Sequence, residues 1–147
     1  MTLQIKDVVL RDDESGDTVL IGFAGLAAAL APLVEPGPVW SIDSDWDGTM
    51  REDSPLDFAD VSDAFAKTQA AACTWDEVGA LCRPVAQFFD LEIDGRAAVQ
   101  GLTDATISIV CYDGSTWEIT GERAFLDCVA PAFHDTTLIE TPERLRV

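Results

Sequence analysis

Two segments of this chain alternate apolar and acidic residues, and this pattern limits the possible folds more than any other feature. In an extended strand successive side chains point to opposite faces, so a two-residue period separates the two kinds of side chain. Residues 39–46 carry Trp40, Ile42 and Trp46 on one face and Val39, Ser41, Asp43 and Asp45 on the other. Residues 89–94 carry Phe89, Leu91 and Ile93 on one face and Asp90, Glu92 and Asp94 on the other. Both segments predict strands that bury an apolar side and present carboxylates to solvent, and Asp94-Gly95 predicts a turn after the second.

The other segments predict helices and further strands in an irregular order. Strands are predicted over residues 3–11, 18–23, 106–112, 116–120 and 136–140. Helices are predicted over residues 25–34 and 122–133, and two further helices are predicted to begin at Ser54 and at Thr74. The first two strands predict an opening hairpin around a turn that holds Asp12, Asp13, Glu14 and Asp17. This order indicates an α+β fold, with three to four helices packed on a largely antiparallel sheet. We expect a single domain over residues 1–147, of which 48% are hydrophobic.

The two central helices have recognisable starts. Ser54, Pro55 and Asp57 are typical of a capped first turn. The side chains that this helix would turn inward are Phe58, Val61, Phe65 and Ala72. Thr74 and Glu77 form the pattern of a capping box. The apolar stripe predicted for that helix, with a kink at Pro84, is Trp75, Val78, Leu81, Cys82, Val85 and Phe88.

The loop between residues 106–112 and 116–120 sets the register of a hairpin. A two-residue turn would place Ile109 opposite Glu118. A three-residue loop places Ile109 opposite Ile119, and Cys111 opposite Trp117. Because the longer loop brings apolar side chains together on one face, burial favours it.

The chain is strongly acidic, with 27 acidic side chains, 9 basic ones and a formal net charge of −18. Residues 41–63 contain eight carboxylates and one cation, Arg51. Crowded like charges destabilise a folded protein, so this density points to a basic partner or a bound cation. Nucleic acid and anionic membrane surfaces are excluded as partners because both are themselves negatively charged.

The sequence also predicts where the protein acts. The apolar segment 19–34 is too short for a membrane span and is flanked by acidic residues, and it lies too far from Met1 for a signal peptide. The four cysteines include no Cys-x-x-Cys pair, and Cys82, Cys111 and Cys128 fall on predicted apolar faces. We therefore expect reduced, buried thiols in a soluble protein of the cytoplasm.

The motif DSDWDG at residues 43–48 resembles the first half of an EF-hand calcium loop. In such loops alternate carboxylates converge on one ion, and a glycine permits the tight turn. The closing glutamate of the loop falls at Ser54 here, and Arg51 lies among the ligand positions. Glu52 or Asp53 could close a non-standard loop, so calcium binding stays an alternative, and we assign no metal or cofactor.

No combination of residues predicts catalysis. His134 is the only histidine, and no zinc-ligand, Ser-His-Asp or Cys-His spacing surrounds it. The sequence also contains no glycine-rich phosphate loop. We therefore expect a protein that is not an enzyme.

Trp46 lies between two carboxylates, a composition typical of an anchor for an Arg- or Lys-rich partner. The candidate partner-binding residues, chosen for charge and position, are Asp43, Asp45, Trp46, Asp47, Glu52, Asp53, Asp57 and Asp60.

The segment CYDGSTWEITGERAFLDCVAPAF, residues 111–133, predicts a hairpin followed by a short amphipathic helix. It resembles the C-terminal part of small bacterial immunity-type proteins. The resemblance implies an intracellular antitoxin without catalytic activity, which neutralises a toxin domain encoded beside it, and it assigns no binding residues. Our leading hypothesis is therefore an immunity protein that inhibits a basic, nuclease-like toxin. The alternatives are a calcium-binding module and a structural or accessory domain without a ligand.

Overall fold

The computed structural model describes the backbone of residues 1–6, 8–11, 18–20, 22–114 and 116–141. These residues form a seven-stranded sheet in the order β4-β6-β7-β8-β1-β9, in which β5 also pairs with β6. All of its described strand pairs are antiparallel. Strands β2 and β3 pair separately, and the described residues include four α-helices. The predicted α+β fold is therefore confirmed.

The strands are β1 (Thr2–Ile5), β2 (Val8–Arg11), β3 (Thr18–Leu20), β4 (Ser41–Ile42), β5 (Asp47–Met50), β6 (Val85–Arg96), β7 (Thr106–Tyr112), β8 (Thr116–Thr120) and β9 (Thr136–Ile139). The helices are α1 (Phe23–Leu30), α2 (Phe58–Ala70), α3 (Trp75–Cys82) and α4 (Arg123–Val129), and short 3₁₀ turns at Ala31–Leu33 and Ala130–Ala132 follow α1 and α4. The carboxylates predicted for the first hairpin turn, Asp12, Asp13, Glu14 and Asp17, lie outside the described residues. None of the described helices has the length and apolar character needed to cross a membrane.

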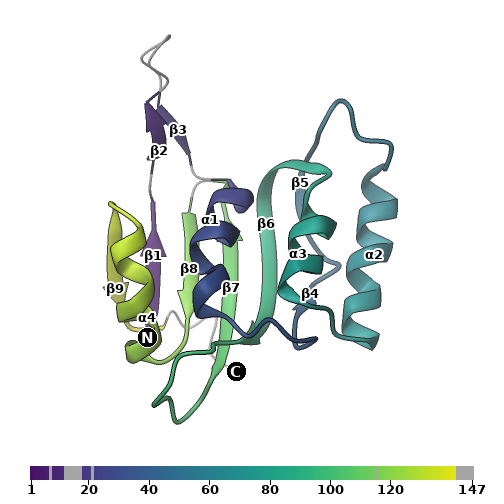
Figure 1. Ribbon diagram of the computed structural model, residues 1–147. Helices are drawn as coiled ribbons and strands as arrows, with labels where there is room; N and C mark the ends of the chain where they lie inside the picture. Colours follow the sequence, from purple (N-terminus) through teal and green to yellow (C-terminus); the bar gives the residue numbers. More distant parts are fainter. Residues whose placement is uncertain (7, 12–17, 21, 115, 142–147) are drawn as a thin grey trace.

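The helices are distributed along the sheet, as Figure 1 shows. Helix α1 lies over β7 and β8, and α4 lies beside β1 and β9. Helices α2 and α3 lie at the opposite end, where β4 and β5 form the edge of the sheet. The acidic segment 41–63 therefore belongs to one end of the molecule, and α4 to the other.

The core lies between the sheet and the helices. Ile109 and Ile119 on the sheet, together with Leu26 and Leu30 on α1, are completely buried. Burying one such side chain stabilises the fold by about 1.5–3 kcal/mol. The hairpin of β7 and β8 has the predicted register, with Ile109 opposite Ile119 and Cys111 opposite Trp117. Its three-residue loop contains two left-handed residues, Asp113 and Gly114.

Strand β6 is longer than predicted and determines where Trp40 packs. The strand continues through Gly95 to Arg96, so the turn predicted at Asp94-Gly95 is wrong. The Trp40 ring lies so close to Gly95 that a Cβ at this position would clash with it. Glycine is therefore needed here for close packing inside a strand rather than for a turn.

The segment 39–46 is buried as predicted but is less regular than predicted. Trp40, Ile42 and Trp46 are all buried, which confirms their common inward face. Only Ser41 and Ile42 form a strand, however, and a second strand, β5, begins at Asp47. The predicted strand 3–11 is likewise divided, because β1 pairs with β8 and β9 while β2 pairs with β3. The opening hairpin is therefore β2–β3 alone.

The two central helices differ from the predictions at their ends. Helix α2 begins at Phe58 with Asp57 as its N-cap, and the Ser54 hydroxyl instead accepts a hydrogen bond from the Leu56 N–H at 3.1 Å. Phe58 is consequently exposed, and Ala72 lies outside the helix. Val61 and Phe65 are buried as predicted.

Helix α3 has the predicted capping box of Thr74 and Glu77, but it ends at Cys82. Proline lacks an N–H and clashes with the preceding helical turn, so Pro84 ends this helix instead of kinking it. Val85 and Phe88, predicted on its stripe, lie in β6.

Two inward faces were assigned wrongly at the level of single residues. Phe88 is buried and Phe89 only half-buried, because the pairing of β5 with β6 is irregular between Asp47 and Gly48. Cys128 is exposed, since α4 buries Phe125, Leu126 and Val129 instead.

Candidate functional site

The acidic segment 41–63 runs along the β4–β5 edge of the sheet and into α2. Within the described residues none of its eight carboxylates forms an ion pair. The ion pair that the structure does show, Arg123 with Asp127 at 3.9 Å, lies on α4. The structure places most of the candidate residues either on the sheet or at the start of α2, while Asp45 is exposed in the loop between β4 and β5 and belongs to neither group.

The first group lies on the face of the sheet opposite to the buried side chains of Leu91 and Ile93. Directly opposite residues of an antiparallel pair point to the same face, and Asp47 lies opposite Asp90, while Ser41 lies opposite Asp94. We call this group the acidic sheet face. Its members are Asp43, Asp47, Asp90, Glu92 and Asp94.

The charges of the acidic sheet face act on one another. Burial raises the pKa of Glu92, and the charges of Asp94 and Asp43 raise it further. Burial also raises the pKa of Asp94, as does the charge of Asp43, while a hydrogen bond from Ser108 opposes the rise. A cation bound here would relieve this repulsion. The alternation of residues 89–94 predicted the outward direction of Asp90, Glu92 and Asp94. These residues were not predicted as site residues, because the sequence does not show that β6 pairs with β4 and β5.

The second group lies at the start of α2. Asp57 and Asp60 form a reciprocal capping box, in which each side chain accepts a hydrogen bond from the backbone N–H of the other, at 2.9 and 3.0 Å. Leu56 and Phe58, on either side of Asp57, are both 43% exposed. We call this group the α2-start patch. Its members are Glu52, Asp53, Leu56, Asp57, Phe58 and Asp60.

Trp46 is buried beneath Phe58 of the α2-start patch, so it is not an exposed binding residue as the sequence had suggested. Only 5% of Trp46 is exposed, and its Nε1–H donates to the Ser62 hydroxyl at 2.8 Å. The Phe58 ring stacks on it, with ring centroids 4.3 Å apart and an angle of 14° between the rings. The exposed aromatic residue of this surface is therefore Phe58.

Leu56 and Phe58 were not predicted as site residues because the helix cap was predicted at Ser54. With a helix that begins there, helical periodicity places Phe58 on the inward face. The pair Asp57 and Asp60, an acid three residues after a possible cap, was the signal for a later start.

The loop geometry that the calcium-binding alternative would require at residues 43–48 is not formed. The Asp43 carboxylate accepts a hydrogen bond from the Asp45 N–H at 2.9 Å, and the Asp47 carboxylate accepts one from the Gly48 N–H at 2.8 Å. The chain then continues as β5 instead of turning back around an ion. In the part of the chain that the structure describes, no three His, Cys, Asp or Glu residues are placed to hold a metal ion.

The cysteines are free, and three of them, Cys73, Cys82 and Cys111, are buried. Burial raises the pKa of all three thiols, that of Cys111 to about 12. Since the thiolate is the nucleophilic form, these side chains are unsuited to nucleophilic chemistry at neutral pH. His134 is exposed and lies just before β9, which forms the opposite edge of the sheet from β4.

Comparison with known proteins gives no family assignment, since no family model, curated protein or solved structure matches this chain.

Proposed function

We propose that this protein is a non-catalytic inhibitor of a basic partner in the cytoplasm, and that the partner is a nuclease-like bacterial toxin domain. The single observation that carries the proposal is the α2-start patch. Two large apolar side chains, Leu56 and Phe58, are exposed there among carboxylates that form no ion pair with any residue the structure describes.

The composition of the patch fits a protein-binding surface. Binding hot spots consist of a few apolar or aromatic side chains surrounded by a polar rim, and their truncation costs most of the binding energy. Phe58 is held in place by its stack on buried Trp46, so little conformational freedom is lost when a partner covers it. The capping box likewise fixes the Asp57 and Asp60 carboxylates before binding.

The charge favours a cationic partner of the nuclease kind. Enzymes that act on nucleic acid bind its phosphates with clustered lysines and arginines. The acidic sheet face and the α2-start patch lie at the same end of the molecule and would attract such a surface over a long range. The similarity of residues 111–133 to immunity-type proteins adds support, although those residues form β8 and α4 and lie away from the patch.

The experiment is capture of a partner by the immobilised protein from a lysate of its own source, at low and at high salt. The proposal predicts recovery of one basic protein at low salt, its loss at high salt, and inhibition of its enzymatic activity by the free protein. Capture by a Leu56→Ala/Phe58→Ala variant should be strongly reduced.

A matched control is Leu138→Ala, which truncates a half-buried apolar residue on β9, at the opposite end of the sheet. Both variants are first checked for cooperative unfolding. Equal capture by wild type and by the patch variant, or inhibition that survives loss of the patch, would contradict the proposed surface.

A further inference from the structure

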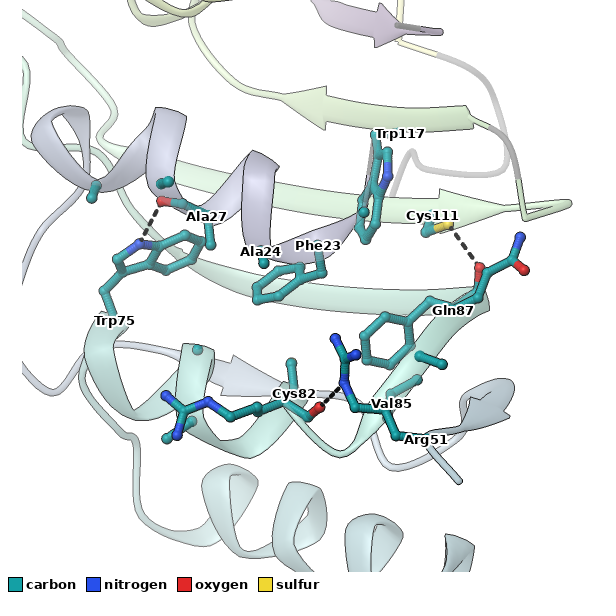
Figure 2. Close-up of a pocket in the computed structure, with 18 of the residues that line it drawn as sticks. Phe23, Ala24, Ala27, Arg51, Trp75, Cys82, Val85, Gln87, Cys111 and Trp117 are labelled. Carbon is teal, nitrogen blue, oxygen red and sulfur yellow. Dashed lines mark hydrogen bonds between the residues drawn. The ribbon is translucent and has the colours of Figure 1, made fainter. Parts of the chain in front are cut away.

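A cavity of about 790 Å³ opens between α1, α3 and the adjoining ends of β6, β7 and β8 (Figure 2). This volume lies in the range of small-molecule sites, roughly 300–1,000 Å³. Four buried aromatic side chains contribute to its lining: Phe23, Trp75, Phe88 and Trp117. The cavity is separate from the α2-start patch, none of whose members lines it.

The cavity walls are held in place by hydrogen bonds. The Trp75 Nε1–H donates to the Ala27 carbonyl at 3.2 Å, which joins α3 to α1 (Figure 2). The Cys111 thiol donates to the Phe88 carbonyl at 3.6 Å, and the Gln87 amide donates to the Gly114 carbonyl at 3.3 Å. These hydrogen bonds connect α3 with α1, and β6 with the β7–β8 hairpin, around the cavity.

The charged residues of the cavity have the opposite sign from the rest of the chain. Arg51 and Arg83 line it together with one carboxylate, Asp76, although acids outnumber bases 27 to 9 in the whole sequence. The Arg51 Nε–H donates to the Arg83 carbonyl at 2.7 Å, and Figure 2 shows its side chain extending toward Phe23. In the described residues neither guanidinium forms an ion pair. The Arg51 guanidinium, which lies toward Phe23, is therefore available to an anion.

Gly79, in the middle of α3, contributes to keeping the cavity open. A Cβ added at Gly79 would meet no atom within 4 Å, so packing does not require glycine at this position. Glycine inside a helix is less favourable than alanine by about 0.8–1 kcal/mol. Gly79 thus weakens the helix at a position where a larger side chain would project into the cavity.

We propose that this cavity binds a small amphipathic anion, an aromatic carboxylate in chemical class. Its apolar body would lie against the apolar lining beside Phe23, and its carboxylate would accept hydrogen bonds from Arg51. Binding is non-covalent, because the Cys82 and Cys111 thiols in the lining are protonated at neutral pH. This site is additional to the proposed partner surface and does not depend on it.

The test compares two fluorescent probes that share one aromatic body. Anilinonaphthalene sulfonate carries an anionic group, and phenylnaphthylamine is the same molecule without it. A chain with a net charge of −18 repels anions at long range, so any preference for the anionic probe must come from local cations. We expect the sulfonate to bind about tenfold more tightly than the amine in fluorescence titrations, the effect of one good charge-assisted hydrogen bond.

Two variants locate the binding in this cavity. Arg51→Gln should lower affinity for the sulfonate and leave affinity for the amine unchanged. Arg96→Gln, an exposed arginine that does not line the cavity, is the matched control and should change neither. Gly79→Leu should abolish binding of both probes while the melting temperature stays equal or rises, which separates loss of the cavity from loss of the fold.

Four results would overturn the proposal. One is equal or tighter binding of the amine by the wild type, and another is unchanged sulfonate binding by Gly79→Leu. A third is sulfonate fluorescence that appears only when the near-ultraviolet circular dichroism of the tryptophans is lost, because this dye also binds partly unfolded chains. The fourth is probe affinity that falls as protein concentration rises, which would mean that a second copy of the chain covers the cavity.

Discussion

The α2-start patch and the cavity differ in chemistry, although they contain neighbouring residues of the sequence. The patch is an exposed surface where Leu56 and Phe58 lie among carboxylates, whereas the cavity is a concave site with aromatic walls and two arginines. Arg51 and Glu52 are consecutive in sequence, yet Arg51 contributes to the cavity and Glu52 to the patch. Net charge therefore describes the long-range field of this chain, whereas a few local residues can give one site the opposite charge.

Trp46→Ala should have the largest effect, because it removes the support of the patch. Truncating a buried tryptophan costs about 3–5 kcal/mol of unfolding free energy. Trp46 also contacts Phe65 and Phe88, with ring centroids 5.6 Å away in each case. Urea denaturation measures the loss. Trp46→Phe, which keeps a ring under Phe58 but loses the bond to Ser62, should cost only about 1 kcal/mol. A similar loss for both would show that the hydrogen bond, and not the ring, supports α2.

Phe58→Ala should separate the patch from the cavity. Truncating a hot-spot aromatic costs about 2 kcal/mol or more of binding energy, which is at least a tenfold loss of partner affinity. Affinity for the anionic probe should be unchanged, because Phe58 does not line the cavity. Calorimetric titration with the purified partner and fluorescence titration with the probe measure the two effects. Parallel loss of both would show that the two sites are coupled.

Gly79→Ala should stabilise α3 by about 0.8–1 kcal/mol, since it replaces a helix-interior glycine without a clash. Thermal unfolding measures this gain. A lower melting temperature would show that the space beside Gly79 is needed for packing.

The acidic sheet face should give a smaller, pH-dependent effect. The pKa values of Glu92 and Asp94 are raised in the folded state, so the folded protein holds these protons more tightly than the unfolded chain does. Their contribution to stability therefore becomes less favourable as pH rises from the ordinary carboxylate range through the raised pKa values. A Glu92→Gln/Asp94→Asn variant should be more stable than wild type at neutral pH, and the difference should disappear in acid. Urea denaturation at several pH values measures it, and a difference independent of pH would contradict the repulsion.

Calcium should not change the stability of the protein. Asp43 and Asp47 already accept backbone hydrogen bonds, and the described carboxylates do not gather around an ion position. We expect an unchanged melting temperature in millimolar Ca²⁺ and in EDTA. A rise that is specific to calcium would revive the EF-hand alternative.

Local patterns were sufficient to predict most of the framework. The alternation in residues 39–46 and 89–94 gave the inward faces of Trp40 and Ile93 correctly, and burial alone selected the register of β7 with β8. The capping box at Thr74 was equally local. These features depend on residues close in sequence, so a single sequence is enough to predict them.

The sites needed tertiary information. Whether Trp46 is buried depends on α2 and β6, and the exposure of Phe58 depends on a helix start that differs from the predicted one by a few residues. The acidic sheet face required the pairing of β6 with β4 and β5. The cavity combines residues from α1, α3 and three strands, and no spacing in the sequence shows that Arg51 and Trp117 line one space.

The most direct test of the proposed partner surface is a comparison of two charge reversals in binding to the captured partner. The first variant is Asp53→Lys. Asp53 lies in the α2-start patch, and its carboxylate accepts no hydrogen bond and forms no ion pair in the described structure. Asp127→Lys makes the same change of charge on α4, where it disturbs only an exposed ion pair.

We predict that Asp53→Lys weakens binding about tenfold or more at low salt, that the loss shrinks as salt is added, and that Asp127→Lys changes the affinity by less than about twofold. Equal losses for the two variants would mean that net charge alone attracts the partner, and would contradict a binding surface at the start of α2.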